Sequence, residues 1–286
     1  MRPLLKWAGG KHRLVPEIAK AFGGPCQGTW VEPFLGSGAV FLALRASGFV
    51  GRARLGDAND KLIAVHIAVR DQPDAVLSAL GELPAGPTWP DVFARVREAY
   101  NEGPTTGPKH AARFMWLNRA AFNGLYRENR KGEFNVPRGS YVTLSLPTAE
   151  HVRQASELLQ GVELTTMDFG DLMRGVGEGD MIYCDPPYVP LTETASFTGY
   201  CRLPFGRAEH IRLAEAARRA GLAGARVVLS NHDLPVVRNE LYAVDRGFEH
   251  VARPRVARAI SRAAASRVSV DEILARIGPT DRSSAA

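Results

Sequence analysis

Short apolar segments with strand character alternate with amphipathic segments of helical period, and this alternation is the strongest constraint on how the chain can fold. Strands that alternate with helices are typical of an α/β fold with a doubly wound, mostly parallel sheet and helices on both faces. The predicted elements are a helix at 14–22, a strand at 29–31, a helix at 39–48, a strand at 53–57, helices within 60–80 that break before Pro73, strands at 162–168, 181–185 and 225–231, and a helix at 207–220.

The alternation is interrupted between residues 81 and 165, where the composition changes. Proline and glycine punctuate LPAGPTWP and NEGPTTGPK, and a basic, aromatic block follows, RFMWLNRAAFNGLYRENRKGEFNVPRGSY. We interpret residues 61–164 as an inserted, mainly helical domain, which splits a sheet domain into residues 1–60 and 165–280. The polar end of the sequence, 281–286, is expected to be disordered.

The composition favours a cytoplasmic protein with a polyanionic partner. The chain has 286 residues and a formal net charge of +6, and no run approaches the roughly 18 apolar residues of a membrane span, so we expect no membrane contact. The three cysteines have no metal-ligand spacing, so we expect reduced thiols and no metal site. The sequence points to no obligate protein partner and does not indicate an oligomeric state.

The segment YCDPPYVP at 183–190 follows the apolar run of a predicted buried strand. Proline fixes its own backbone and pushes the residue before it toward extended geometry, so Asp185 and Tyr188 stand at the two ends of a rigid loop. A carboxylate and an aromatic ring held in this way can receive a flat ligand that forms hydrogen bonds. The same segment would also suit a turn that merely ends the strand.

A glycine-rich turn, FLGSG at 34–38, joins a predicted strand to a predicted helix, and Asp57 ends the next strand. Glycine lets a ligand approach the backbone, the start of a helix offers free N–H groups, and an acid at this spacing can bind ribose hydroxyls. The third glycine of dinucleotide folds and the GK[ST] loop of phosphate sites are both missing. A nucleoside without phosphates, such as S-adenosylmethionine, therefore fits better than NAD or ATP.

The sequence KWAGGK at 6–11 places two lysines and a tryptophan around a pair of glycines. In the functional interpretation, Trp7 and Lys11 lie at the cofactor and Lys6 is free for DNA. In the alternative, the segment is a solvated turn with Trp7 packed on the core.

Taken together, these motifs resemble the Dam-type DNA adenine methyltransferases, of the D12 class and alpha group. The blocks that carry the resemblance run in the family's order through most of the chain: KWAGGK, VEPFLGSGAVFL, GDAND, LNRAAFNGLYRENRKGEFNVPRGSY, YCDPPYVPLTETASFTGY, LSNHD and VDEILA. The resemblance implies a Rossmann-like methyltransferase domain that binds S-adenosyl-L-methionine, an inserted target-recognition domain, and methylation of adenine N6 in double-stranded DNA, within GATC. One segment departs from the family: ISRAAASR at 260–267 replaces a polar stretch that relatives often carry, which puts a DNA contact there in doubt.

The resemblance also assigns roles to individual residues. The catalytic motif is Asp185, Pro186, Pro187 and Tyr188. The cofactor-binding residues are Trp7, Lys11, Phe34, Gly36, Gly38, Asp57, Asp168 and Asp185, and the residues that read DNA are Lys6, Asn123, Leu125, Arg127, Pro137 and Tyr141.

The chemistry of this transfer explains why such residues are needed. The lone pair of adenine N6 is delocalised, so an acceptor such as Asp185, with a backbone carbonyl of the Pro-Pro unit, would make the nitrogen more nucleophilic. The base lies in the duplex stack and has to be flipped out, and Tyr188 can replace the lost stacking. We expect no catalytic histidine, and we interpret Asn231-His232-Asp233 as a structural strand end.

Two alternatives follow from the same residues. The first keeps methyl transfer and changes the acceptor to RNA adenine, cytosine N4 or a protein glutamine amide. The second is a DNA-binding protein that retains the cofactor fold without catalysis. The motif residues are intact, which argues against this alternative: Asp185, Pro186, Tyr188, Gly36, Gly38 and Asp57.

Overall fold

The computed structural model describes residues 3–86, 89–141, 143–191, 205–257 and 269–279. The end at 281–286, predicted to be disordered, and the divergent segment 260–267 both lie outside the described residues. Within the described part, no helix combines the length and the apolar character needed to cross a membrane.

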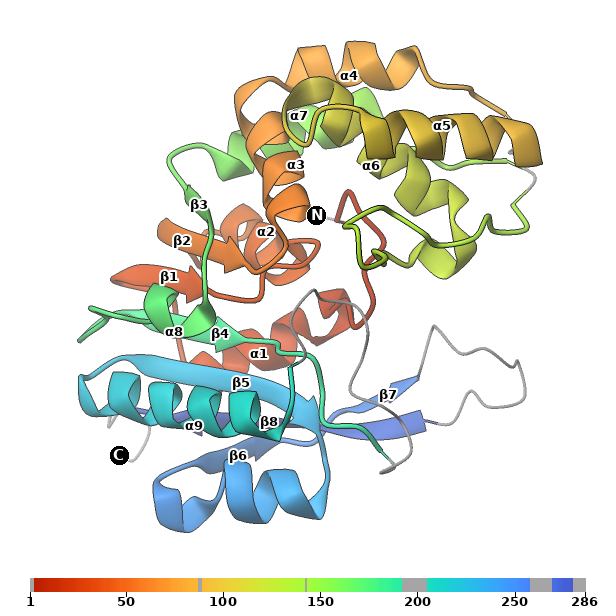
Figure 1. Ribbon diagram of the computed structural model, residues 1–286. Helices are drawn as coiled ribbons and strands as arrows, with labels where there is room; N and C mark the ends of the chain where they lie inside the picture. The colour runs from red at the N-terminus through yellow and green to blue at the C-terminus, as the bar shows by residue number, and fades with distance from the viewer. Residues whose placement is uncertain (1–2, 87–88, 142, 192–204, 258–268, 280–286) are drawn as a thin grey trace.

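The helical and strand segments follow one another in a simple order (Figure 1). They are η1 (His12–Leu14), α1 (Val15–Phe22), β1 (Thr29–Glu32), α2 (Ala39–Ala46), β2 (Arg52–Asp57), α3 (Asp60–Asp71), α4 (Pro73–Gly81), α5 (Pro90–Glu102), α6 (Gly107–Ala120), η2 (Phe122–Gly124), α7 (Ala149–Leu159), β3 (Glu163–Thr166), α8 (Phe169–Leu172), β4 (Met181–Cys184), α9 (Arg207–Leu222), β5 (Arg226–His232), η3 (Val237–Leu241), η4 (Val244–Arg246), β6 (Glu249–Ala252), β7 (Arg255–Ala257) and β8 (Ser269–Ile277).

The strands form one sheet in the order β3-β2-β1-β4-β5-β8-β6, and β7 pairs with β8 beside this path. Neighbours from β3 to β5 run parallel, whereas β8 runs antiparallel to β5, β6 and β7. The predicted α/β fold with a mostly parallel, Rossmann-like sheet is confirmed. The antiparallel strands after β5 were not among the sequence predictions.

Each central strand packs on both of its faces. Along β4, Tyr183 belongs to one buried cluster and Ile182 to the other, as expected when successive side chains point to opposite sides of a sheet. Helices α1, α2 and α3 cover the first face, and α8 and α9 cover the second (Figure 1). Burial on both sides explains why β4 reads as a continuous apolar run rather than an alternating one.

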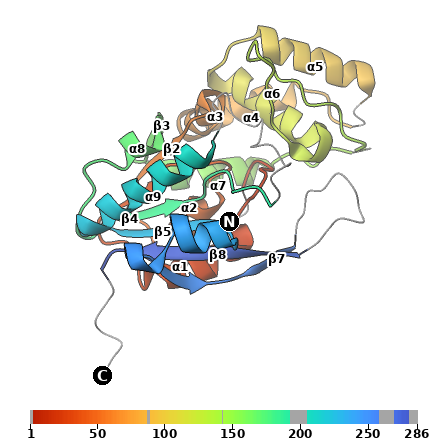
Figure 2. The same ribbon diagram turned by 60° about the horizontal axis from the view of Figure 1, so that its bottom comes forward.

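The region between β2 and β3 consists of α3 to α7 and the long loop that follows α6. Helix α6 packs on α3, α4 and α5, and these helices stand to one side of the sheet (Figure 2). One hydrophobic cluster runs without a break from the sheet into this region and includes Trp30, Val69, Phe114 and Trp116. The proposed boundaries at 61 and 164 remain a prediction.

The strand order reverses between β1 and β4, because β1 continues toward β2 and β3 while β4 continues toward β5. In open α/β sheets, ligands bind beyond the carboxyl ends of the strands at such a reversal. Both sequence motifs lie there: the Phe34–Gly38 turn follows β1, and the Asp185–Tyr188 loop follows β4.

Core packing on β2 gives a first testable prediction. Leu55 is 0% exposed, so Leu55→Ala should lower the free energy of unfolding by about 2–5 kcal/mol, through lost apolar burial and the cavity left behind. Leu222, at 84% exposed, is the matched control, and Leu222→Ala should change stability by less than about 0.5 kcal/mol. Urea unfolding followed by circular dichroism measures both. Equal losses in the two variants would contradict this account of the core.

Candidate active site

Acidic side chains gather at the carboxyl edge of the parallel strands. Glu32 ends β1 and Asp57 ends β2, while Asp168 and Asp185 follow β3 and β4 closely in the chain. Strand β8 runs the other way, so its beginning lies at the same edge, with Glu272 paired opposite His232 of β5. The edge therefore collects several carboxylates.

The glycine turn after β1 is tied to the end of β2. The backbone N–H of Gly36 donates to Asp57 Oδ2 at 2.9 Å, and the N–H of Asn59 donates to Oδ1 at 3.0 Å. Gly36 and Gly38 have φ values of 52° and 68°, a backbone conformation that favours glycine. Buried His66 on α3 lies with Nε2 2.9 Å from the carbonyl oxygen of Gly36. The turn is thus held on both sides, and burial raises the pKa of Asp57.

The ring of Trp7 covers this turn. A Cβ atom added to Gly36 would come within 2.9 Å of Trp7 Cδ1, so only glycine allows this close approach. On the side of the helical region, Trp7 stacks with Tyr126 at 5.9 Å and with Phe114 at 6.4 Å between ring centres. Trp7 therefore connects the glycine turn to the helical region.

Among the residues that the structure describes, Asp185 has two polar partners, and both contact the same oxygen. Lys11 Nζ lies 3.2 Å from Asp185 Oδ1, and the Ser230 hydroxyl donates to Oδ1 at 2.9 Å. Lys11 is 5% exposed, so its ammonium is buried and depends on such partners. The contacts fix the orientation of the carboxylate and direct Oδ2 away from them.

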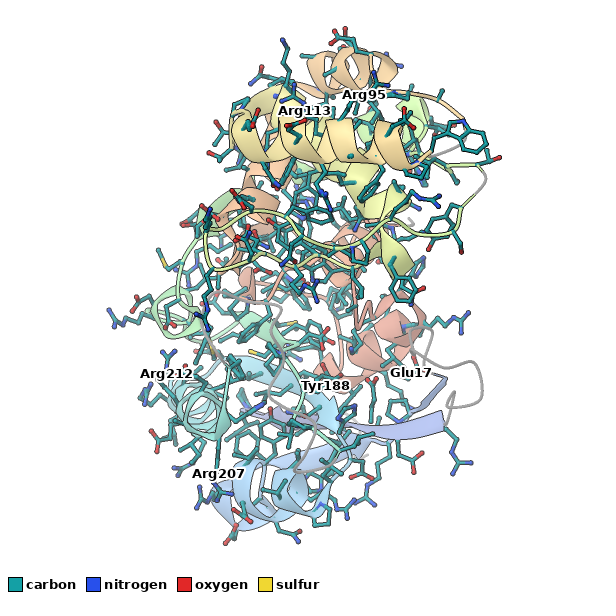
Figure 3. The ribbon with its side chains drawn as sticks, turned by 45° about the vertical axis from the view of Figure 1, so that its right-hand side comes forward. Glu17, Arg95, Arg113, Tyr188, Arg207 and Arg212 are labelled. Carbon is teal, nitrogen blue, oxygen red and sulfur yellow. The ribbon has the colours of Figure 1, made fainter. Side chains whose placement is uncertain are left out.

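Tyr188 is oriented from several directions. Its hydroxyl donates to Glu272 Oε2 at 2.9 Å, Lys11 Nζ lies 4.5 Å from the ring centre, and the ring meets the His232 ring edge-on at 4.9 Å. The next residue, Val189, donates its N–H to Asn231 Oδ1 at 3.1 Å, and its carbonyl oxygen lies 2.7 Å from His232 Nδ1. The structural role expected for Asn231 and His232 agrees with these contacts. In Figure 3, Tyr188 lies beside the strands in the lower half of the picture, away from the helices that carry Arg95 and Arg113.

Burial and charge perturb the titration of this site. Burial raises the pKa of Glu32 to about 8, the Trp30 Nε1–H bond to Oε2 at 3.0 Å lowers it, and the nearby charge of Asp185 raises it further. Burial, together with the charges of Asp185 and Glu272, also raises the pKa of Tyr188 well above its usual value. Tyr188 is therefore neutral over the physiological range and donates its hydroxyl proton.

Asp168 lies at the same edge but is already paired. Arg212 on α9 donates Nη1 and Nη2 to the two carboxylate oxygens at 2.6 and 2.7 Å and holds the pKa of Asp168 below its usual value. The Arg212 guanidinium also stacks 3.9 Å from the ring centre of Phe169, which stacks on Phe34 at 5.4 Å. Asp168 and Phe34 thus belong to one aromatic and charged cluster; Figure 3 shows Arg212 at the periphery of the molecule.

The N-terminal segment is fastened to the helical region through buried Asn118. The Lys6 N–H donates to Asn118 Oδ1 at 2.8 Å, and Asn118 Nδ2 donates to the carbonyl oxygens of Lys6 and Gly124 at 2.7 and 3.0 Å. Lys6 Nζ lies 4.5 Å from the ring centre of Tyr141, and burial together with Arg119 lowers the pKa of Lys6. Two of the predicted DNA-reading residues, Lys6 and Tyr141, are therefore in contact.

The other four predicted DNA-reading residues lie on a hairpin-like loop after α6, closed by bridges Ala121–Arg138 and Glu128–Phe134. Arg127 is exposed and is oriented by Asn135, through Nε to Oδ1 at 2.7 Å and Nη2 to the carbonyl oxygen at 3.3 Å. Asn123, Leu125 and Pro137 complete this set. Asn123 has a φ of 53°, an uncommon conformation for a residue other than glycine.

The structure brings the predicted site residues into four groups: the glycine turn with Trp7 and Asp57, the Asp185–Tyr188 loop with Lys11, the cluster of Asp168 with Phe34, and the hairpin-like loop with Lys6. Sequence reasoning assigned no role to three further residues near these groups. Ser230 and Glu272 form hydrogen bonds with Asp185 and Tyr188, and Glu32, which accepts from Trp30, is close enough for the charge of Asp185 to raise its pKa. Each lies inside a quoted motif block, respectively LSNHD, VDEILA and VEPFLGSG, but spacing alone does not tell a core residue from a site residue.

Comparison with known proteins identifies the class to which this fold and site belong. Residues 7–254 match the family described as D12 class N6 adenine-specific DNA methyltransferase, and the chain belongs to this family. It is 36% identical over 279 residues to a DNA adenine methylase of Escherichia coli strain K12, which covers 97% of this chain and 96% of that protein. It is 32% identical over 243 residues to the type II methyltransferase M.MjaIII of Methanocaldococcus jannaschii, which covers 81% and 84%.

The predicted enzyme class is therefore confirmed: this chain is an adenine-specific DNA methyltransferase, and its substrate is DNA. Among solved structures, a precorrin 8W decarboxylase of Methanobacterium thermoautotrophicum covers 93% of this chain with a TM-score of 0.37 and 13% identity. That likeness is too distant to add to the fold described above.

The raised pKa of Glu32 predicts a dependence of stability on pH. The unfolded chain loses this proton near pH 4.5 and the native protein near pH 8, so the native state holds the extra proton between these values. The free energy of unfolding should therefore fall as pH rises through this window, by up to about 1.4 kcal/mol for each unit of pKa difference. Glu32→Gln should remove this component while keeping an acceptor for Trp30. Urea unfolding at pH 5, 6.5 and 8 tests it, and a pH-independent difference between the two proteins would contradict the assignment.

Proposed function

We propose that this enzyme transfers the methyl group of S-adenosyl-L-methionine to N6 of adenine within GATC in double-stranded DNA, after the adenine is flipped out of the helix. The observation that carries the proposal is the Asp185–Tyr188 loop at the reversal of the sheet, with an oriented carboxylate at one end and an oriented aromatic ring at the other. A DNA substrate also favours action in the cytoplasm, at the nucleoid.

The residues around the glycine turn fit S-adenosylmethionine. The Phe34–Gly38 turn precedes the start of α2, where free N–H groups would suit the methionine part of the cofactor. Asp57 has lone pairs beyond its two backbone contacts for ribose hydroxyls, because a carboxylate accepts up to about four hydrogen bonds. Asp168 and the ring of Phe34 would lie at the adenine, and Trp7 and Lys11 would close the remaining sides.

When bound, the cofactor supplies a methyl group on a sulfonium, which is already a good leaving group. The protein therefore has to position and polarise the acceptor nitrogen. Lys11 and Ser230 both contact Asp185 Oδ1, so Oδ2 is the oxygen suited to accept an N6 hydrogen. The carbonyl of Pro186, which proline rigidity holds in place, would accept the second hydrogen and direct the nitrogen lone pair at the methyl group.

The target adenine has to leave the duplex stack before it can reach this loop. Tyr188 offers an aromatic ring for the extruded base, and base–aromatic stacking contributes about 1–3 kcal/mol. Pro186 and Pro187 hold the ring and the carboxylate at a fixed separation. Recognition of the edge and the face of the base would then occur at the two ends of the same short loop.

The loop after α6 and the N-terminal segment are suited to hold and read DNA. Arg127, Arg130, Lys131 and Arg138 are all exposed in this loop, and such a cluster attracts phosphates. Arg127 is held by Asn135, and an ordered guanidinium can contact O6 and N7 of a guanine in the major groove. Lys6, in contact with Tyr141, would contribute at the first guanine of GATC.

Methyl transfer from tritium-labelled S-adenosylmethionine to defined duplexes tests the whole proposal. We expect incorporation into a GATC duplex and strongly reduced incorporation when any one base pair of the site is changed. Digestion with restriction enzymes that are blocked by, or that depend on, GATC methylation gives an independent readout. Equal transfer to all duplexes would refute the GATC assignment, and preferential transfer to RNA or to cytosine would refute the acceptor.

Asp185 provides a direct test of the clamp. Asp185→Asn should lower kcat by about 10²–10³-fold, because an amide cannot supply the same charge to the polarised N6 group, while DNA affinity changes little. Asp245→Asn, at an exposed position on η4, is the control and should keep full activity. Single-turnover methylation and a DNA-binding titration measure the two effects. A variant that retains more than about a tenth of kcat would rule out the proposed role.

Arg127 and Arg130 separate reading of the sequence from holding of the backbone. Arg127→Ala should cost about 1–3 kcal/mol in kcat/KM on GATC and relax the preference at one base pair. Arg130→Ala, on the same loop, should weaken all sequences alike and reduce the salt dependence of binding. We would measure kcat/KM on GATC and its single-base variants at two salt concentrations. If Arg127→Ala lowers every substrate equally, Arg127 does not read the sequence.

A further inference from the structure

Glu272 is a buried carboxylate that the catalytic scheme above does not use. It lies near the beginning of β8, in register with His232 at the end of β5, and is 8% exposed. Because β8 runs antiparallel to β5, its early residues reach the edge at which the parallel strands end. Glu272 therefore approaches the Asp185–Tyr188 loop from a strand that carries none of the predicted site residues.

One oxygen of Glu272 contacts two of the proposed site residues. The hydroxyl of Tyr188 donates to Oε2 at 2.9 Å, and Lys11 Nζ lies 3.9 Å from the same atom. Lys11 in turn lies 4.5 Å from the centre of the Tyr188 ring and 3.2 Å from Asp185. The ring is therefore held at its polar end by Glu272 and on one side by the ammonium group that Glu272 and Asp185 share.

We propose that Glu272 is a positioning residue, which fixes the orientation of the Tyr188 ring for stacking with the target adenine; this inference rests on the proposed function. A tyrosine ring can turn about two side-chain bonds, and its hydroxyl is its single polar attachment. A hydrogen bond to a carboxylate is stronger than one between neutral groups, so it can hold the ring in one orientation before the base arrives. The stacking surface is then formed in advance.

The competing explanation is that Glu272 only balances the buried charge of Lys11 and so stabilises the fold. The two explanations differ in what the hydroxyl of Tyr188 does. If Glu272 acts through the hydroxyl, removal of either partner has the same effect, and removal of both adds nothing. If Glu272 acts only through Lys11, loss of the hydroxyl has no consequence.

The experiment compares Glu272→Ala, Glu272→Gln, Tyr188→Phe and the double variant Tyr188→Phe/Glu272→Ala in steady-state methylation. We expect Glu272→Ala and Tyr188→Phe each to lower kcat about tenfold with KM for DNA within about twofold, and the double variant to equal the lower single variant. Glu272→Gln keeps an oxygen that accepts from the hydroxyl, so it should recover most of kcat. Unchanged kcat in Tyr188→Phe, additive losses in the double variant, or no recovery with glutamine would each overturn the proposal.

A fluorescent base provides a readout that a purely structural role would not change. With 2-aminopurine at the target position, Glu272→Ala and Tyr188→Phe should alter the emission of the bound complex in the same direction. The control is the neighbouring Asp271, an exposed residue paired with Arg255 at 3.1 Å, and Asp271→Asn should leave the emission unchanged. Emission unchanged in both, or equally altered by Asp271→Asn, would overturn the proposal. If Glu272→Ala does not fold, the kcat and the 2-aminopurine emission of Tyr188→Phe alone test the proposal. Wild-type protein in the same assays tests the proposed function separately, since its failure to methylate GATC would be seen before any variant is compared.

Discussion

The arrangement of the candidate active site depends on one buried ammonium group. Lys11 brings a positive charge into a region with several carboxylates, and its contacts with Asp185 and Glu272 allow those side chains to lie close together. Without the charge of Lys11, the carboxylates of Asp185 and Glu272 would repel each other. The pairing at Lys11 therefore sets the geometry on which the Asp185–Tyr188 loop depends.

The same N-terminal segment also reaches the helical region. Asn118 binds both backbone groups of Lys6, while Lys11, a few residues further along, contacts Asp185. Trp7 lies between them, against the glycine turn on one side and Tyr126 on the other. A short stretch of chain thus contacts the regions proposed to bind cofactor, base and DNA, which explains why it combines glycines with large and charged residues.

Sequence reasoning succeeded where the physical signal is local. The strands and helices around the glycine turn and the Asp185–Tyr188 loop follow from apolar periodicity and from the conformations that glycine and proline favour. It missed β6, β7 and β8, because an antiparallel strand inserted between two others depends on long-range pairing. It also assigned no role to Ser230, which reaches Asp185 through the pairing of β4 with β5, or to Glu272, which reaches the site through the pairing of β5 with β8.

The place of β8 in the sheet affects when, during folding, the candidate active site becomes complete. Lys11 lies near the beginning of the sequence and Glu272 near its end, so their proximity is among the most non-local contacts in the fold. Such contacts form late, since the intervening chain has to be ordered first. A partly folded chain would present the Asp185–Tyr188 loop without the charge pattern around it. Assembly of this edge therefore couples chemical competence to completion of the sheet.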